Sequence, residues 1–339
     1  MRTMGAFVIA TAIVAAVAAP ASAHHSAAAF DTQKEVKLTG SVVSYRFANP
    51  HVYLTLQVKK DDGSTVMTEV EAGAAAVLNG LGFTKNSIAV GDVVTIVGNP
   101  ARNNPTTLVL GRELYKRDGT YMPLNIASRS AYDAKTATAA TATSIAGTWF
   151  APRSEFGAFL GSSGRWQLTD KGKAASANAD ARNNNLKDCV PVGAPGLMLY
   201  PVADVITVQR DRVIMKVDWM DSERTVFLDG RKHPPASETF LQGHSVGKWE
   251  GTALSVETTN FKDNAMGLSM ALPGSTQKRL TERFALGDDR KSLIYSGVME
   301  DTVYLSQPVT WTSKLEYRPT MAPSNQKCDK EIARKFLQQ

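Results

Sequence analysis

The chain has 339 residues, of which 43% are hydrophobic and 21% are charged, so it falls among globular proteins long enough for two domains. Its formal net charge of +6 is spread thinly, without a run of basic residues and without basic residues interleaved with aromatic ones. Composition therefore argues against a nucleic-acid partner.

The first 23 residues have the features of a secretory signal peptide. Arg2 supplies a basic start, residues 7–19 form an apolar run, and Ala21-Ser22-Ala23 is a small-residue cleavage site. The apolar run is too short to span a bilayer comfortably, and no second run follows it. We expect cleavage near Ala23, a periplasmic or secreted location, and no transmembrane anchor in the mature chain.

Residues 24–127 alternate apolar and polar side chains in short runs separated by turns, which is typical of β-strands. One stretch, residues 74–81, has the composition of a helix and ends at glycines. Five strands with one helix before the fourth predict a small OB-like barrel. The expected strands are 35–45, 52–58, 65–71, 93–98 and 106–114.

Residues 128–144 are rich in Ala, Thr and Ser and have no large apolar side chain after Tyr132. Such a segment cannot bury a core, so we expect a flexible linker between two domains.

Residues 145–339 contain a second series of short, evenly spaced strands after Gly147-Thr148-Trp149. Short helices are expected at 169–178 and 329–337, and the apolar stretch 266–273 is expected as a packed loop or a lid. The spacing predicts a larger antiparallel barrel of about eight strands, wide enough for one small ligand. After the first strand, the expected strands are 204–209, 212–219, 224–228, 253–259, 278–285, 292–299 and 309–317.

Two sets of motifs resemble known families. His24-His25-Ser26-Ala27 and Asn49-Pro50-His51-Val52 look like a family of exported bacterial proteins of unknown function. The segments 229–234 (Asp-Gly-Arg-Lys-His-Pro) and 243–251 (Gly-His-Ser-Val-Gly-Lys-Trp-Glu-Gly) are similar to uncharacterised lipocalin-like domains of secreted bacterial proteins. The resemblance implies export and the two barrel folds, and it implies no particular reaction.

The mature N-terminus is a candidate metal site. The amine and ring of His24, with the ring of His25 or His51, can supply nitrogen ligands in one plane, which favours Cu(II). The alternative is that a new N-terminus carries two histidines without any role. Copper binding or handling is therefore one hypothesis for function.

The second candidate site lies in two loops of the larger barrel. His233 follows the turn at Asp229-Gly230, and His244, Trp249 and Glu250 lie in the glycine-flanked segment 243–251. If both loops meet at one barrel mouth, these four side chains surround a ligand. A histidine that acts as a general base with Glu282 or Glu300 nearby gives a hydrolase or isomerase alternative, and a purely structural role for the histidines is open as well.

Cys189 and Cys328 are the two cysteines, and both lie in the second domain of an exported chain. We expect one intradomain disulfide, which would constrain the unfolded chain by about 4–5 kcal/mol. No pattern of a known catalytic or cofactor motif occurs. The leading hypothesis is a binding protein for a small, apolar ligand inside the second barrel, with no certain cofactor and unknown protein partners.

Overall fold

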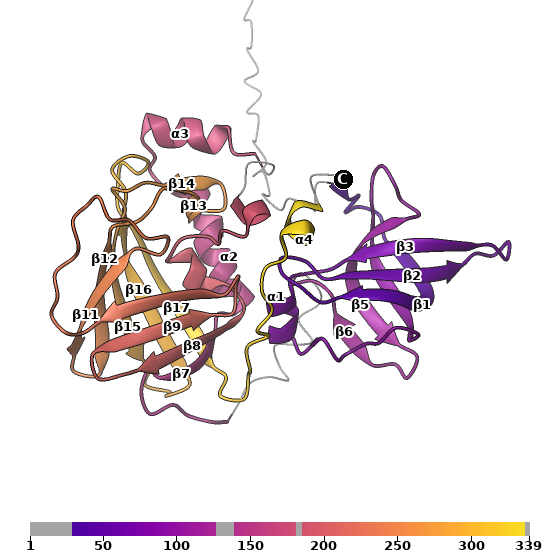
Figure 1. The fold of residues 1–339 in the computed structure, drawn as a ribbon, viewed down its shortest axis with the longest axis horizontal. Helices are drawn as coiled ribbons and strands as arrows, with labels where there is room; N and C mark the ends of the chain where they lie inside the picture. The colour runs from indigo at the N-terminus through magenta and orange to yellow at the C-terminus, as the bar shows by residue number, and fades with distance from the viewer. Residues whose placement is uncertain (1–28, 127–138, 181–184, 336–339) are drawn as a thin grey trace, which may run out of the picture.

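The computed structural model describes residues 29–126, 139–180 and 185–335, so the expected signal peptide, His24 and His25 lie outside the described residues. Strands dominate the described chain and form two closed barrels, a small one followed by a larger one (Figure 1). The predicted all-β fold class is confirmed.

The first barrel has the strand order β3-β2-β1-β4-β5, and a parallel pairing of β3 with β5 closes it. The helix α1 (Ala75–Gly80) stands between the third and fourth strands, as the sequence predicts. A short strand, β6 (Tyr121–Pro123), extends the sheet beyond β5 and was not predicted. The barrel strands are β1 (Val36–Arg46), β2 (Tyr53–Lys59), β3 (Thr65–Glu71), β4 (Val93–Pro100) and β5 (Leu108–Lys116).

The second barrel is closed by nine strands rather than the expected eight or so. All neighbouring pairs are antiparallel except β10 and β11, which run parallel. The unpredicted member is β11, which occupies the segment expected as a loop. The strands are β7 (Gly147–Phe150), β8 (Ala203–Val208), β9 (Arg212–Val217), β10 (Ser222–Phe227), β11 (His244–Glu250), β12 (Ala253–Thr259), β15 (Arg279–Leu286), β16 (Ser292–Glu300) and β17 (Val309–Tyr317).

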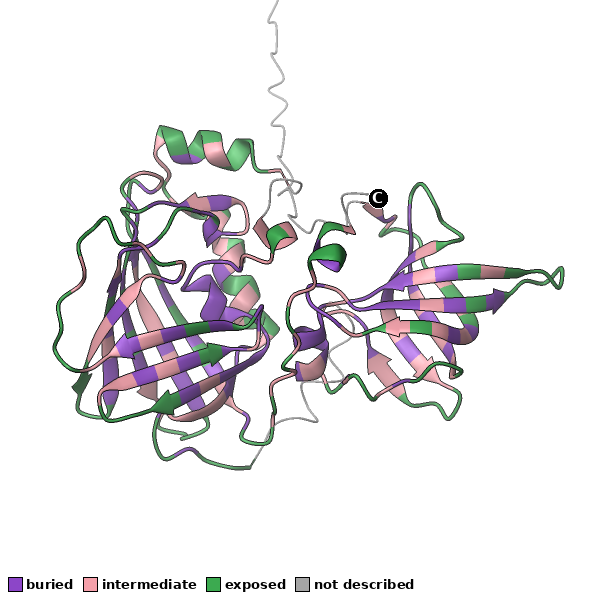
Figure 2. Ribbon diagram, viewed as in Figure 1, coloured by how far each residue is buried: buried purple, intermediate pink, exposed green. Residues whose placement is uncertain are grey.

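Alternation along these strands fills the interior of the second barrel. In β15, Leu280, Glu282 and Phe284 are buried while the residues between them are exposed, which is the period expected of a strand with one face inward. Figure 2 shows the same alternation as purple and green bands along the strands. Large side chains such as Trp149 and Tyr295 are fully buried in this core.

Short elements cover one end of the second barrel. The hairpin of β13 (Asn264–Ser269) and β14 (Leu272–Gly274) buries Met266 and Leu268. The stretch 266–273, expected as a packed loop or a lid, therefore packs against the hydrophobic core of the second barrel. Thr169 caps helix α3 (Asp170–Ala177) by accepting a hydrogen bond from Gly172. The other short helices here are α2 (Arg153–Ser162), η3 (Ser163–Arg165), η5 (Asn185–Asp188) and η6 (Gly196–Leu199).

Only part of the expected linker is described. Ala142 is buried in the core of the second barrel, its amide donates to Arg290, and the Arg290 side chain donates back to its carbonyl. The end of the segment expected as a linker, residues 128–144, is therefore held against the second barrel at Ala142, whose small side chain fits a core position.

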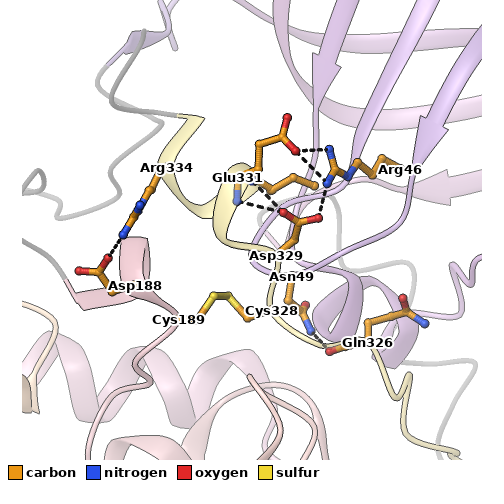
Figure 3. The surroundings of a disulfide bond; sticks show 10 residues. Arg46, Asn49, Asp188, Cys189, Gln326, Cys328, Asp329, Glu331 and Arg334 are labelled. Carbon is orange, nitrogen blue, oxygen red and sulfur yellow. Dashed lines mark hydrogen bonds and ion pairs between the residues drawn. A yellow bond between two sulfur atoms is a disulfide. The ribbon is translucent and has the colours of Figure 1, made fainter.

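The C-terminal segment connects both barrels. The disulfide joins Cys189, next to η5 in the second barrel, to Cys328, whose neighbour Asp329 forms an ion pair with Arg46 of β1 (Figure 3). Helix α4 (Lys330–Lys335) then packs beside the first barrel, where Lys335 pairs with Glu69. The predicted disulfide is confirmed, but Cys328 belongs to a segment shared between the barrels rather than to the second barrel alone.

Helix α1 and the residue before it also lie in the contact between the barrels. Ala74, Ala76 and Val77 belong to the hydrophobic cluster of the second barrel, although α1 follows a strand of the first. Within the described ranges, no helix is long and apolar enough to cross a membrane.

Candidate functional site

A buried ion pair lies inside the second barrel. Arg224 of β10 donates from Nη1 to Glu282 Oε1 at 3.0 Å and from Nη2 to Oε2 at 2.6 Å. The two side chains are 1% and 0% exposed. Paired bonds of this kind are the strongest arrangement of arginine with a carboxylate, and a buried charge needs such a partner.

Hydroxyl groups complete this network. Tyr295 donates to Glu282 Oε1 at 2.6 Å, while Arg224 donates to Thr258 at 3.1 Å and to Ser245 at 3.3 Å. Burial tends to raise the pKa of Glu282, but the Arg224 guanidinium outweighs burial and holds that pKa below its ordinary value. Burial and the Glu282 carboxylate raise the pKa of Tyr295 well above its ordinary value. The network therefore keeps Glu282 ionised and Tyr295 protonated.

Lys278 lies at the covered end of the same barrel and is 1% exposed. Its ammonium group donates to the carbonyls of Ala194 and Gly267, and it lies 4.5 Å from the ring centroid of Phe261. Burial lowers the pKa of Lys278 to about 7. This side chain thus joins two of the segments that cover the barrel end.

Several buried polar atoms inside the barrel have no hydrogen-bond partner in the described protein. They are both carboxyl oxygens of Asp204, the indole nitrogens of Trp219 and Trp311, and Nε of Arg224. Burial and the neighbouring Asp218 raise the pKa of Asp204 well above its ordinary value, so its carboxyl is a neutral donor and acceptor. Each unpartnered buried group costs about 1–3 kcal/mol, so these atoms are the candidates for hydrogen bonds to a polar molecule.

These atoms lie on two adjoining parts of the barrel wall. Trp311 is paired in register with Gly297, and Gly297 with Glu282, so the indole lies beside the ion pair. Gly297 leaves room for this ring, because a Cβ there would come within 2.6 Å of Trp311. Asp204 is paired with Val217, and Val217 with Ser222, two residues before Arg224.

The four predicted mouth residues do not all come together. His233 and His244 do meet, with their Nδ1 atoms 2.9 Å apart. However, the next residue, Ser245, faces the interior, so His244 points to the outside of the barrel. Trp249 and Glu250 lie at the far end of β11, about 16 Å and about 20 Å from His244 at the usual rise per residue.

The histidine–carboxylate pairs considered from the sequence are also separated. Glu282 lies on the inner face and His244 on the outer face, while Glu300 on β16 is three strands away from His244. Three strand spacings amount to about 14 Å. Neither Glu282 nor Glu300 therefore lies beside His244, as the hydrolase or isomerase alternative required.

His51 is positioned at the entrance to β2. Its Nδ1 lies 3.1 Å from the carbonyl of Ala72 and 3.4 Å from Oε1 of Glu71, which is fully buried. Histidines that bind metals usually engage their second nitrogen with a carboxylate or a carbonyl in this way. Nε2 of His51 is thereby left as the nitrogen available to an external partner.

Sequence reasoning missed Arg224, Lys278, Tyr295 and Asp204. The sign of such a residue in the sequence is a polar side chain at a position where the alternation of its strand predicts a buried one. In β10, Arg224 stands two residues from buried Ser222 and Val226. Such a residue is assigned to the inner face only once the register of the whole strand is known.

Comparison with known proteins gives a family match for the first part of the chain. Residues 11–109 match the family model described as "Family of unknown function (DUF6152)". This match ends within β5, and no family match supports the lipocalin-like resemblance of the second part. No curated protein matches the chain.

Proposed function

We propose that this chain is an exported binding protein that holds a small polar molecule inside the second barrel. The observation that carries the proposal is the set of unpartnered polar atoms of Asp204, Trp219, Trp311 and Arg224 in a buried interior. Their mixture of donors and acceptors favours a polar ligand over the apolar one expected from the sequence.

The size of the ligand is limited by the packing. Trp149, Phe284 and Tyr295 are fully buried and occupy much of the barrel. Two surface hollows lie elsewhere, one lined by Glu69 and Lys335 and the other beside residues 323–327. We therefore propose a molecule of a few heavy atoms that bonds to the indole N–H groups and to Arg224, and that enters when the covering hairpin moves.

Export is part of the proposal, and the disulfide supports it. A bond between Cys189 and Cys328 is stable in an oxidising compartment and rare in the cytosol. Determination of the first residue of protein purified from its native host tests this part. An N-terminus at His24 is expected, and intact Met1 would contradict it.

Native mass spectrometry of protein purified without denaturation tests ligand binding. We expect a retained small molecule in the wild-type protein and much lower occupancy in Trp219→Phe and Trp311→Phe. Trp166→Phe is the matched control, because the Trp166 indole already donates to Ser162 at 3.0 Å. A mass equal to the bare chain, or equal occupancy in all variants, would overturn the proposal.

Copper binding is the second candidate, because Nε2 of His51 is oriented by Glu71 and Ala72. The described chain also begins on the side of the first barrel where His51 lies. Residue 29 lines the same hollow as Lys335, and the Lys335 ammonium lies 4.0 Å from the ring centroid of Tyr53, close to His51. We propose that His24, His25 and His51 bind Cu(II) in the mature protein.

Electron paramagnetic resonance during Cu(II) titration of the mature protein tests this candidate. A nitrogen-rich signal at one equivalent is expected, and it should be lost in His51→Ala or when one extra residue precedes His24. A signal unchanged in both variants would exclude this site.

A further inference from the structure

Two imidazoles face each other on the outer surface of the second barrel. His233 lies in the loop between β10 and β11, and His244 is the first residue of β11. Their ring centroids are 5.1 Å apart with an interplanar angle of 76°, and their Nδ1 atoms are separated by 2.9 Å. The nitrogens therefore point at each other, with one proton between them.

Aromatic packing fixes the His244 ring. His244 stacks on Phe227 with ring centroids 5.2 Å apart, and Phe240 covers it at 6.0 Å. Gly243 places His244 by its positive φ of 74°, and a Cβ there would approach Thr258 to 2.5 Å.

The loop that carries His233 is tied down by Asn260, whose amide donates to three backbone carbonyls, those of residues 234, 235 and 238. The facing nitrogens are thus a preorganised feature of the fold rather than a chance contact between exposed side chains.

The surroundings favour the neutral form of the His244 imidazole. Burial, then His233 and then Arg231, lower the pKa of His244. Asp229 and Glu238 act in the opposite direction on the same group. Metal ions bind the neutral form of histidine, which the surroundings favour at His244.

The number and direction of the donors select the ion. Among the described residues, no group of three or more histidine, cysteine or carboxylate side chains is placed to hold a metal, so a four-coordinate ion lacks its remaining ligands. Two facing nitrogens with no third ligand side chain placed beside them in the described residues fit a two-coordinate, monovalent ion, and imidazole is a suitable ligand for copper.

We propose that His233 and His244 form a two-coordinate Cu(I) site on the outer face of the second barrel. The ion replaces the shared proton, which moves to Nε2 of the ring that donated it, so binding releases no net proton. The rings separate slightly to admit the ion. This site is independent of the barrel interior and of the proposed Cu(II) site at the N-terminus.

Anaerobic titration of the full chain with Cu(I) against a chromophoric Cu(I) chelator tests the site. We expect His233→Asn and His244→Asn each to weaken one equivalent by about 100-fold or more, since the loss of even an outer partner of a ligand costs 10–100-fold. Lys232→Asn, an exposed position in the same loop, is the matched control and should leave this equivalent in place. Unchanged Cu(I) binding in both loop variants would overturn the proposal.

A measurement on the wild-type protein guards against variants that fold poorly. Ag(I) is a redox-inert substitute for Cu(I), and ¹⁵N nuclear magnetic resonance reports each histidine nitrogen. One equivalent of Ag(I) should shift the Nδ1 signals of His233 and His244 together. If neither signal moves, the contact is a hydrogen bond only and the proposal is wrong.

Discussion

The buried pair of Arg224 and Glu282 gives the sharpest test of how the second barrel is held together. We consider Arg224→Met, Glu282→Met and the double variant. Both side chains are at most 1% exposed, and two hydrogen bonds join them. Either single change leaves one buried charge without its partner.

The expected magnitudes follow from that burial. Each single variant should lower the free energy of unfolding by about 3–5 kcal/mol, whereas the double variant should return close to the wild-type value or exceed it. In Arg224→Met, burial without Arg224 raises the pKa of Glu282 above its unfolded value. The destabilisation should therefore develop as pH rises above about 4.5 and diminish in more acidic solution.

Urea unfolding followed by tryptophan fluorescence measures these effects. All five tryptophans of the chain lie beyond residue 145, so the signal reports the second barrel alone. The exposed pair Arg279 and Glu257, at 3.1 Å, is the matched control, and its coupling should be below about 1 kcal/mol. A coupling for the buried pair no larger than that of the exposed pair would refute the reasoning.

Three further predictions concern single features of the fold. The pKa of Lys278 is lowered to about 7 from 10.5, so the free energy of unfolding should rise with pH between about 7 and 10, by at most about 1.4 kcal/mol per pH unit. Lys278→Met should flatten this rise in urea unfolding at several pH values, and identical slopes in the two proteins would contradict the prediction. Replacing Cys189 and Cys328 with serine should lower the unfolding free energy by about 2–5 kcal/mol and expose α4 to hydrogen exchange, while unchanged exchange would show that the ion pairs alone hold the helix. Gly243→Ala should destabilise the second barrel more than Gly251→Ala, since both glycines have positive φ but only Gly243 is crowded; equal melting temperatures would rule out the steric argument.

The sequence predicts most strands because alternation is a local property. The expected strand 65–71 coincides with β3, and the expected strand 253–259 coincides with β12. The segment that forms β11 was assigned to a loop, since Gly243 and Gly247 interrupt its pattern and only the neighbouring β12 shows why a strand forms there.

By itself, the sequence determined the all-β class, the helix before the fourth strand, and the pairing of the only two cysteines, because each depends on local periodicity or on a count. Tertiary structure alone decided that Arg224 and Glu282 meet inside the barrel, that His244 faces outward beside His233, and that the C-terminal segment joins both barrels. These contacts join residues far apart in the chain, and a shift of one residue in strand register would turn every such side chain to the opposite face.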